Sequence, residues 1–244
     1  MRKSEKWIKL GGIVLCESFA VFTIINLIVT GETDRLVLAF FTLFLILAPL
    51  LLEKIFHCCI GLPVYIFALA YAIGPMLGHC WKFYYTVRGW DKLLHTSGGV
   101  MFGILGAYFF DFLTKNKKLP GVRAVFALCF SVTVAVLWEF FEFGADAFFG
   151  MDMQNDTIIH GITSHLLEPR VGITGSITDI ESVIVNGTPL PINGYIDIGL
   201  IDSMMDLLLE TIGAAVTCII LWLDGGRHRL IRNQSVVRCA NSRP

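Results

Sequence analysis

Six apolar stretches, each long enough to cross a bilayer, dominate the 244-residue sequence. A transmembrane helix needs about 20 predominantly apolar residues, because its rise of about 1.5 Å per residue must cover a hydrocarbon core about 30 Å thick. In hydrocarbon, a spanning segment must satisfy its backbone N–H and C=O groups internally, which a helix does. The sequence therefore predicts an all-α membrane protein, a bundle of about six transmembrane helices. The stretches run over residues 8–30, 33–52, 60–79, 90–113, 122–144 and 199–223.

The composition agrees with lipid as the solvent for most of the chain. Hydrophobic residues make up 55% of it and charged residues only 16%, whereas an average soluble domain carries about 25% charged residues. With a formal net charge of −1, no domain is basic enough to bind nucleic acid. The seven cysteines form no paired Cys-x-x-Cys motif and lie mostly in apolar stretches. We therefore expect them to be small core residues, and neither a zinc finger nor a disulfide scaffold.

Lysine and arginine residues are distributed unequally between the two sides that six crossings create. If the N-terminus is cytoplasmic, all 19 Lys and Arg residues lie toward the cytoplasm except Arg35, Lys82, Arg88, Lys92 and Arg170. Cytoplasmic loops of membrane proteins carry an excess of such residues. An even number of helices also returns the C-terminus to the side on which the chain starts. We therefore expect both termini in the cytoplasm.

The apolar stretches divide the chain into four parts. Residues 1–146 hold the first five helices, 147–198 form a polar loop on the outer face, 199–223 form the sixth helix, and 224–244 form a cytoplasmic tail. Within the loop, Asp156–Leu167 has apolar residues on one helical face and is expected to be a short amphipathic helix. Residues 171–192 alternate like strands, with Asn186-Gly187 as a hairpin turn. A small strand-containing cap is therefore expected.

Three of the predicted helices carry acidic residues at helical spacing. Residues four positions apart lie about 40° apart on a helix, because each residue turns the chain by about 100°. Each of these helices therefore presents one narrow polar stripe. By the predicted topology the stripes lie near the outer ends of their helices, so they can converge on one pocket. The residues are Asp91 and His95 in the fourth helix, Glu139, Glu142 and Asp146 in the fifth, and Asp202, Asp206 and Glu210 in the sixth.

These acids are costly in a membrane unless something neutralises them. A charged side chain at the bilayer centre costs roughly 2.5–3.5 kcal/mol on the insertion scale, and bound cations, protonation or water can relieve this cost. Carboxylates with an imidazole suit Mg²⁺, Mn²⁺ or Zn²⁺. The sequence lacks the paired Glu-x-x-His motifs of di-iron bundles. We therefore expect the whole set to be candidate ligands of a divalent metal ion, with His95 and Glu142 as candidate catalytic residues.

A purely structural interpretation stays open beside the metal site. Asp91, Asp146 and Asp202 stand near helix ends, where a carboxylate can face interfacial water. Asp91 and Asp202 also lie in first turns, where the helix dipole favours negative charge. The deeper residues, which need another explanation, are His95, Glu139, Asp206 and Glu210.

Small residues at regular spacing indicate where two helices approach closely. Gly99-x-x-x-Gly103, with Gly106 about one turn later, places glycines on one face of the fourth helix. Small residues let helix backbones approach closely in membranes, where apolar side chains gain little from leaving lipid. We expect this face to be a packing surface and not a phosphate-binding loop.

The polar motifs occur in a fixed order along the chain. They are Trp90-Asp91-x-x-x-His95, then Trp138-Glu139-Phe140-Phe141-Glu142 with Ala145-Asp146, then Asp202-Ser203-Met204-Met205-Asp206-Leu207 with Gly213-Ala214. As a set they resemble the bacterial inner-membrane family typified by YjdF, over about Asp91–Ala215 without the outer loop. The chain departs from the shorter family members by an insert between Asp156 and Asp202. The resemblance implies a multi-pass protein of the bacterial cytoplasmic (plasma) membrane and supplies no established activity.

Three classes of function fit these features. The leading hypothesis is a divalent-metal-dependent enzyme that acts at the outer face on a lipid or a lipid-linked phosphate, because metal ions polarise phosphoryl oxygens and activate water. The second is a cation or proton-coupled transporter, because intramembrane acids line such pathways. The third is a structural or sensory membrane protein whose acids form a satisfied polar network. Membrane lipids are the expected partners, and the sequence does not indicate the oligomeric state.

Overall fold

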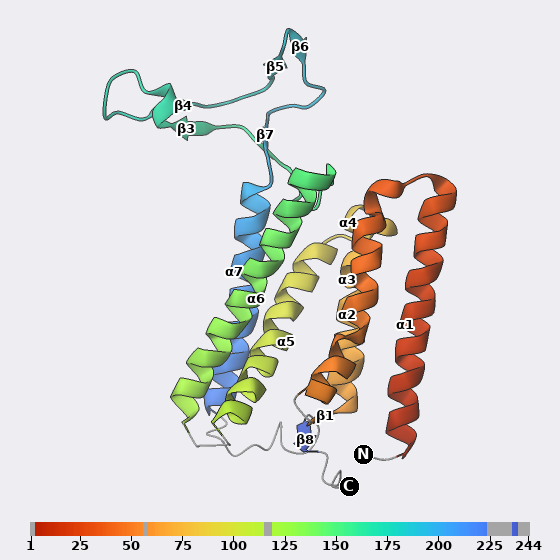
Figure 1. Cartoon of the computed structure of the whole chain (residues 1–244). Helices are drawn as coiled ribbons and strands as arrows, with labels where there is room; N and C mark the ends of the chain where they lie inside the picture. The colour runs from red at the N-terminus through yellow and green to blue at the C-terminus, as the bar shows by residue number, and fades with distance from the viewer. Residues whose placement is uncertain (1–2, 56–57, 115–118, 224–235, 239–244) are drawn as a thin grey trace. The chain divides into compact units, whose positions relative to one another are not determined.

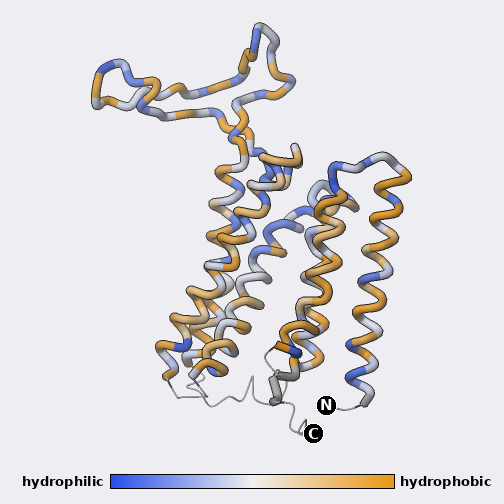
Figure 2. The backbone as a smooth tube through the Cα atoms, viewed as in Figure 1, coloured by the Kyte–Doolittle hydropathy of each residue, from blue (hydrophilic) through white to orange (hydrophobic). Residues whose placement is uncertain are grey.

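The computed structural model describes residues 3–55, 58–114, 119–223 and 236–238, and helices account for most of them (Figure 1). Within this part of the chain, six helices are long and apolar enough to cross a membrane, which confirms the all-α membrane fold. Figure 2 shows that hydrophobic residues predominate along them. The α-helices are α1 (Lys3–Thr30), α2 (Leu36–Ile55), α3 (Leu62–Cys80), the short α4 (Phe83–Thr86), α5 (Trp90–Leu113), α6 (Pro120–Phe149) and α7 (Leu200–Leu223).

The chain divides into two compact units. The first combines the residues up to Trp138 with those from Asp206 onward, and the second comprises Glu139–Met205. The division falls inside α6 and α7, so each of these helices contributes to both units.

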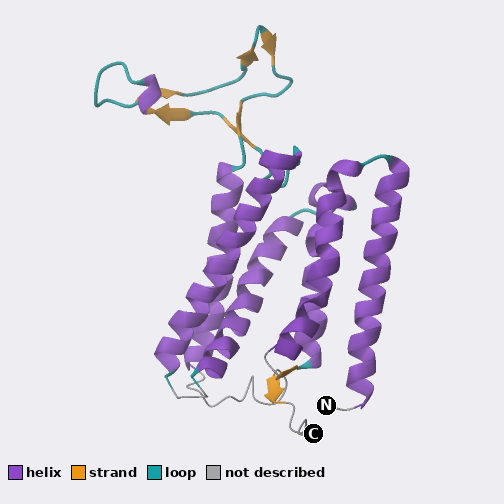
Figure 3. Ribbon diagram, in the orientation of Figure 1, coloured by secondary structure: helices purple, strands orange, loops and turns teal. Residues whose placement is uncertain are grey.

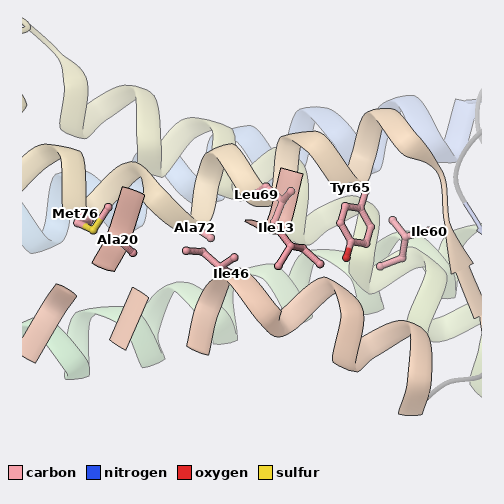
Figure 4. Close-up of a cluster of buried hydrophobic side chains, with 8 residues drawn as sticks. All are labelled: Ile13, Ala20, Ile46, Ile60, Tyr65, Leu69, Ala72 and Met76. Carbon is pink, nitrogen blue, oxygen red and sulfur yellow. The ribbon is translucent and has the colours of Figure 1, made fainter. Parts of the chain in front are cut away.

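In the first unit, α1, α2 and α3 pack around a shared apolar core (Figure 4). Its members are buried because side chains one or two helical turns apart share a face of each helix. At one end of this core, the ammonium of Lys9 contacts Glu53 and the carbonyl of Ile60, both at 2.5 Å, and lies over the ring of Tyr65. The buried members of the core are Ile13, Ala20, Ile46, Ile60, Tyr65, Leu69, Ala72 and Met76.

Two short strands join distant parts of the first unit. β1 (Cys58–Ile60), between α2 and α3, pairs antiparallel with β8 (Val236–Arg238), which follows α7. Two crossings precede β1 and six precede β8. Because both numbers are even, the two strands lie on the same side of the membrane, as their pairing requires. The remainder of the predicted cytoplasmic tail, 224–235 and 239–244, lies outside the described residues.

Glycines set the close approach of α5 and α7. A Cβ atom at Gly99 would collide with the backbone carbonyl of Glu210 and lie 2.9 Å from the amide nitrogen of Ala214, and one at Gly213 would collide with the carbonyl of Thr96. On the same face of α5, a Cβ at Gly106 would lie 2.9 Å from Cα of Ala127 in α6. The predicted packing face of α5 is therefore confirmed.

The second unit contains the predicted strands in its loop, as short antiparallel pairs (Figure 3). The pairs are β2 (Thr157–Ile159) with β7 (Tyr195–Asp197), β3 (Ile162–Ser164) with β4 (Gly175–Ile177), and β5 (Ile184–Val185) with β6 (Thr188–Pro189). The hairpin between β5 and β6 turns at Asn186 and Gly187, whose φ angles of 51° and 82° are those of a type I′ turn.

The expected amphipathic helix over Asp156–Leu167 is wrong. β2 and β3 occupy most of this segment, and only a single 3-10 turn, η2 (His165–Leu167), follows them. Ile158, Ile159 and Ile162 are β-branched, a feature that favours strands, and Gly161 separates the two strands. Pairing with β7 and β4, which are distant in sequence, outweighs the helical spacing of the isoleucines.

Candidate metal centre

Two helices of the first unit supply the core of the site. Asp91 and His95 stand one turn apart near the start of α5, and Asp206 and Glu210 stand one turn apart in α7. The contacts at Gly99 and Gly103 show that α5 and α7 run in the same direction, because Gly99 meets Glu210 and Ala214, whereas Gly103, one turn later in α5, meets Ala214 and Thr217. The two polar stripes therefore face each other, as the predicted topology indicates.

The imidazole of His95 lies between two carboxylates. Its Nε2 atom is 3.5 Å from Oδ1 of Asp91 and 3.6 Å from Oδ2 of Asp206. On the opposite side of the ring, Nδ1 is 3.9 Å from Oε2 of Glu210. Asp91, His95 and Asp206 each offer one ligand atom within 4.8 Å of the others. The structure thus brings four of the predicted ligands together.

Burial makes this group electrostatically demanding. The side chains of Asp206, Glu210 and His95 are 2%, 3% and 7% exposed, and that of Asp91 is 17% exposed. Of the two Glu210 carboxylate oxygens, Oε1 is buried and has no hydrogen-bond partner among the described residues. A buried carboxylate oxygen without a partner carries a desolvation cost, which a nearby cation or proton would reduce.

Lys92 is a member of the site that the helical spacing of the acids does not predict. Its ammonium donates to Oδ2 of Asp91 and to Oδ1 of Asp206, each at 2.8 Å. Lys92 is rotated by about 100° around the helix axis from Asp91, so its Cα atom lies off the polar stripe. Its long, flexible side chain nevertheless reaches around the helix to the carboxylates. The available signal was that Lys92 is one of few basic residues on the predicted outer side.

Glu139 and Glu142 belong to the second unit, at the point in α6 where that unit begins. Both are buried, with 7% and 3% of their surfaces exposed. Their spacing of three residues places them on one face of α6, as the sequence analysis expects. Their part in a metal site stays a prediction.

Asp146 and Asp202 bind the backbone of the loop inside the second unit. Oδ1 and Oδ2 of Asp146 accept hydrogen bonds from the backbone amides of Met153 at 2.7 Å and Gln154 at 2.9 Å. Oδ2 of Asp202 accepts from the backbone and side-chain nitrogens of Asn155, at 3.0 and 3.2 Å. These contacts give both acids a structural part in holding the start of the loop to the helix ends.

The central three residues fit a small divalent ion. With metal–ligand distances of about 2.0–2.2 Å, neighbouring ligand atoms of a tetrahedral site stand roughly 3.3–3.6 Å apart. The separations of 3.5 and 3.6 Å from Nε2 of His95 to the two carboxylates match that spacing. An imidazole and two carboxylates are ligands that Zn²⁺ and Mn²⁺ accept.

Comparison with known proteins gives a family but no activity. A family model described as "Predicted membrane protein (DUF2238)" matches residues 12–227, which include most of the first span, the other five spans and every candidate ligand. No curated protein and no solved structure matches the chain.

Proposed function

We propose a function for this chain as a member of the DUF2238 family of predicted membrane proteins, to which it belongs. In the proposal, the multi-pass membrane protein binds a divalent cation between α5 and α7 and uses it in an enzymatic reaction on a lipid or a lipid-linked phosphate. The observation that carries this proposal is the position of the His95 imidazole between the carboxylates of Asp91 and Asp206, at ligand spacing.

Glu210 supports a metal ion on the Nε2 side of His95. A histidine that binds a metal through one nitrogen usually directs the other toward a carboxylate, a carbonyl or water, which fixes the orientation of the ring. The Glu210 carboxylate lies on the Nδ1 side at 3.9 Å. In this proposal Asp91, His95 and Asp206 are ligands, and Glu210 orients His95 instead of binding the ion directly.

The depth of the site supports a lipid substrate. Asp91 is the second residue of α5 and Asp206 the seventh of α7, so at about 1.5 Å per residue both lie within roughly 10 Å of the helix ends. A lipid headgroup can reach that depth while the acyl chains stay in the bilayer. A divalent ion bound there would polarise a phosphoryl oxygen and activate water.

Two acids of the second unit remain candidates from the sequence. Glu142, which is buried, is our candidate general base, and Glu139 is a further candidate ligand. Asp146 and Asp202 are assigned to holding the loop, because backbone amides occupy their carboxylates.

A transporter is the second candidate, and one observation favours it. Like Oε1 of Glu210, Oε1 of Glu17 in α1 is buried without a hydrogen-bond partner among the described residues. Buried intramembrane carboxylates are typical of proton and cation pathways. The apolar sequence of α7 after Thr217 disfavours a path that continues through this helix.

We also propose in which membrane the protein lies, on which side its termini are, and which proteins it is related to. The distribution of lysine and arginine supports a cytoplasmic N-terminus and C-terminus. The motifs from Trp90 to Ala214 support a place beside the YjdF-like proteins of the bacterial cytoplasmic membrane.

An activity assay tests the enzymatic proposal. The full-length protein in detergent micelles is given phosphatidic acid or an isoprenoid diphosphate with Mg²⁺, Mn²⁺ or Zn²⁺, and released phosphate is measured. We expect EDTA to abolish release, and Asp206→Asn and His95→Ala to lower it by about 100-fold or more, since even outer residues of metal sites cost 10- to 100-fold. Asp34→Asn, which changes an exposed carboxylate outside the site, is the matched control. If every metal–substrate pair is inactive, the proposed phosphate chemistry is wrong, and proton or cation flux in proteoliposomes tests the transporter.

A further inference from the structure

Lys92 occupies the position between Asp91 and Asp206 that a bound cation would compete for. Its ammonium lies 2.8 Å from one oxygen of each carboxylate. The other oxygen of each, Oδ1 of Asp91 and Oδ2 of Asp206, faces Nε2 of His95. The same two carboxylates therefore serve both the lysine and the proposed metal site.

We propose that Lys92 is a tethered counter-ion of these carboxylates when no metal ion is bound, and that a divalent cation binds by displacing its ammonium from Asp91 and Asp206. The inference rests on the proposed metal site and adds a mechanism that controls its occupancy. No covalent bond changes in this exchange, since one cation replaces another between the same carboxylates.

The electrostatics of the buried group explain why its carboxylates need a counter-ion. Asp206 and Glu210 are almost fully buried, and an uncompensated carboxylate there would strongly disfavour the folded state. The unpartnered Oε1 of Glu210 shows that the polar atoms of the group are not all satisfied with Lys92 in place. A divalent ion would bring twice the charge of the ammonium and would bind His95 in addition.

The exposure of Lys92 explains how the exchange can occur. Its side chain is 40% exposed, whereas that of Asp206 is 2% exposed. An ammonium on a flexible four-carbon stem can move into water without any movement of the helices. The carboxylates are held in place by α5 and α7, so the lysine is the mobile member of the group.

Manganese binding to the full-length protein in detergent tests the inference. Free Mn²⁺ is measured by electron paramagnetic resonance during titration of the wild type and of the Lys92→Met, Lys92→Arg and Lys82→Met variants. We expect Lys92→Met to lower the Kd by at least about tenfold, because it removes the competing charge. Lys92→Arg keeps a competing charge and should gain no affinity. Lys82→Met removes an exposed lysine near Glu32 and should leave the Kd unchanged.

A second readout uses the wild type alone and does not depend on how the variants fold. An amine-reactive acylating reagent is added with and without Mn²⁺, and acylation of Lys92 is measured by mass spectrometry, with Lys82 as the internal reference. Displacement predicts a several-fold rise in acylation of Lys92 when Mn²⁺ is present, with no change at Lys82.

The outcomes separate the inference from the proposed function. Mn²⁺ binding to the wild type without a gain in Lys92→Met or a rise in Lys92 acylation overturns the displacement and leaves the metal site standing. Binding by Lys92→Met but not by the wild type supports the competition and contradicts metal binding by the native protein. Binding by neither protein overturns both.

Discussion

The ammonium of Lys92 donates to Oδ1 of Asp206 at 2.8 Å, although 114 positions separate the two residues in the sequence. The contact joins the start of α5 to α7, and it depends on the parallel, close approach of these helices at Gly99 and Gly213. The polar group is therefore a product of helix packing, and changes in that packing should affect both stability and the site.

Gly99→Ala should destabilise the protein, because the new Cβ would collide with the carbonyl of Glu210 and force α5 away from α7. Overpacking of this kind costs about 1–3 kcal/mol. Thermal unfolding of the detergent-solubilised protein, followed by intrinsic fluorescence, measures the effect. Gly11→Ala is the control, since a Cβ in α1 at that position meets nothing within 4 Å. If the two variants unfold at the same temperature, the close approach is wrong.

The sequence predicts the helices and much of the polar group for a simple physical reason. Hydrocarbon leaves a spanning segment few choices besides a helix, and a fixed turn of about 100° then aligns Asp91 with His95 and Asp206 with Glu210. The same reasoning identifies Gly99 as part of a packing face. These features depend on local geometry, which the order of residues determines.

Features that depend on side-chain reach or distant pairing escape this reasoning. Lys92 joins the site because a flexible side chain can leave the face on which its Cα atom lies. The isoleucines at 158, 159 and 162 have helical spacing, but β2 and β3 pair with strands that follow much later. Neither outcome can be read from the spacing of neighbouring residues.

Lys9→Met should lower stability by about 3–5 kcal/mol, because it leaves the carboxylate of Glu53 without its buried partner. The variant also removes the contact of Lys9 with the carbonyl of Ile60. Chemical or thermal unfolding in detergent gives the difference. Lys54→Met changes a neighbouring exposed lysine and should have little effect. Equal stability of the two variants would show that the ion pair does not hold α1 to α2.

Asp146→Asn should loosen the start of the loop in the second unit. The side-chain NH2 of asparagine cannot accept a hydrogen bond, so one of the two acceptor oxygens for the backbone amides of Met153 and Gln154 is lost, at a cost of about 1–3 kcal/mol. Limited proteolysis should then cut within residues 150–156 faster than in the wild type. Asp179→Asn, in the same unit, is the control. If cleavage is unchanged and bound metal is lost, Asp146 is a metal ligand and does not hold the loop.

Asp152→Asn should stabilise the protein in a pH-dependent way. Burial first, and then the charges of Asp156, Asp146 and Asp202, raise the pKa of Asp152. A carboxyl with a raised pKa in the folded state destabilises that state when it is ionised, and the penalty disappears as the pH falls below the raised value. The variant should therefore unfold at a higher temperature than the wild type near neutral pH, and the difference should shrink in acid. A difference that grows in acid would contradict the assigned direction.

The metal content of the purified full-length protein tests the proposed site most directly. Mass spectrometry after incubation with Mg²⁺, Mn²⁺ or Zn²⁺ and removal of free ions should find about one divalent ion per chain in the wild type and in Asp34→Asn. The ion should be lost in Asp206→Asn and His95→Ala while both variants keep their helical content. A wild-type protein that holds no metal under these conditions would contradict the site, and the buried group would then be a polar network neutralised by Lys92 and His95.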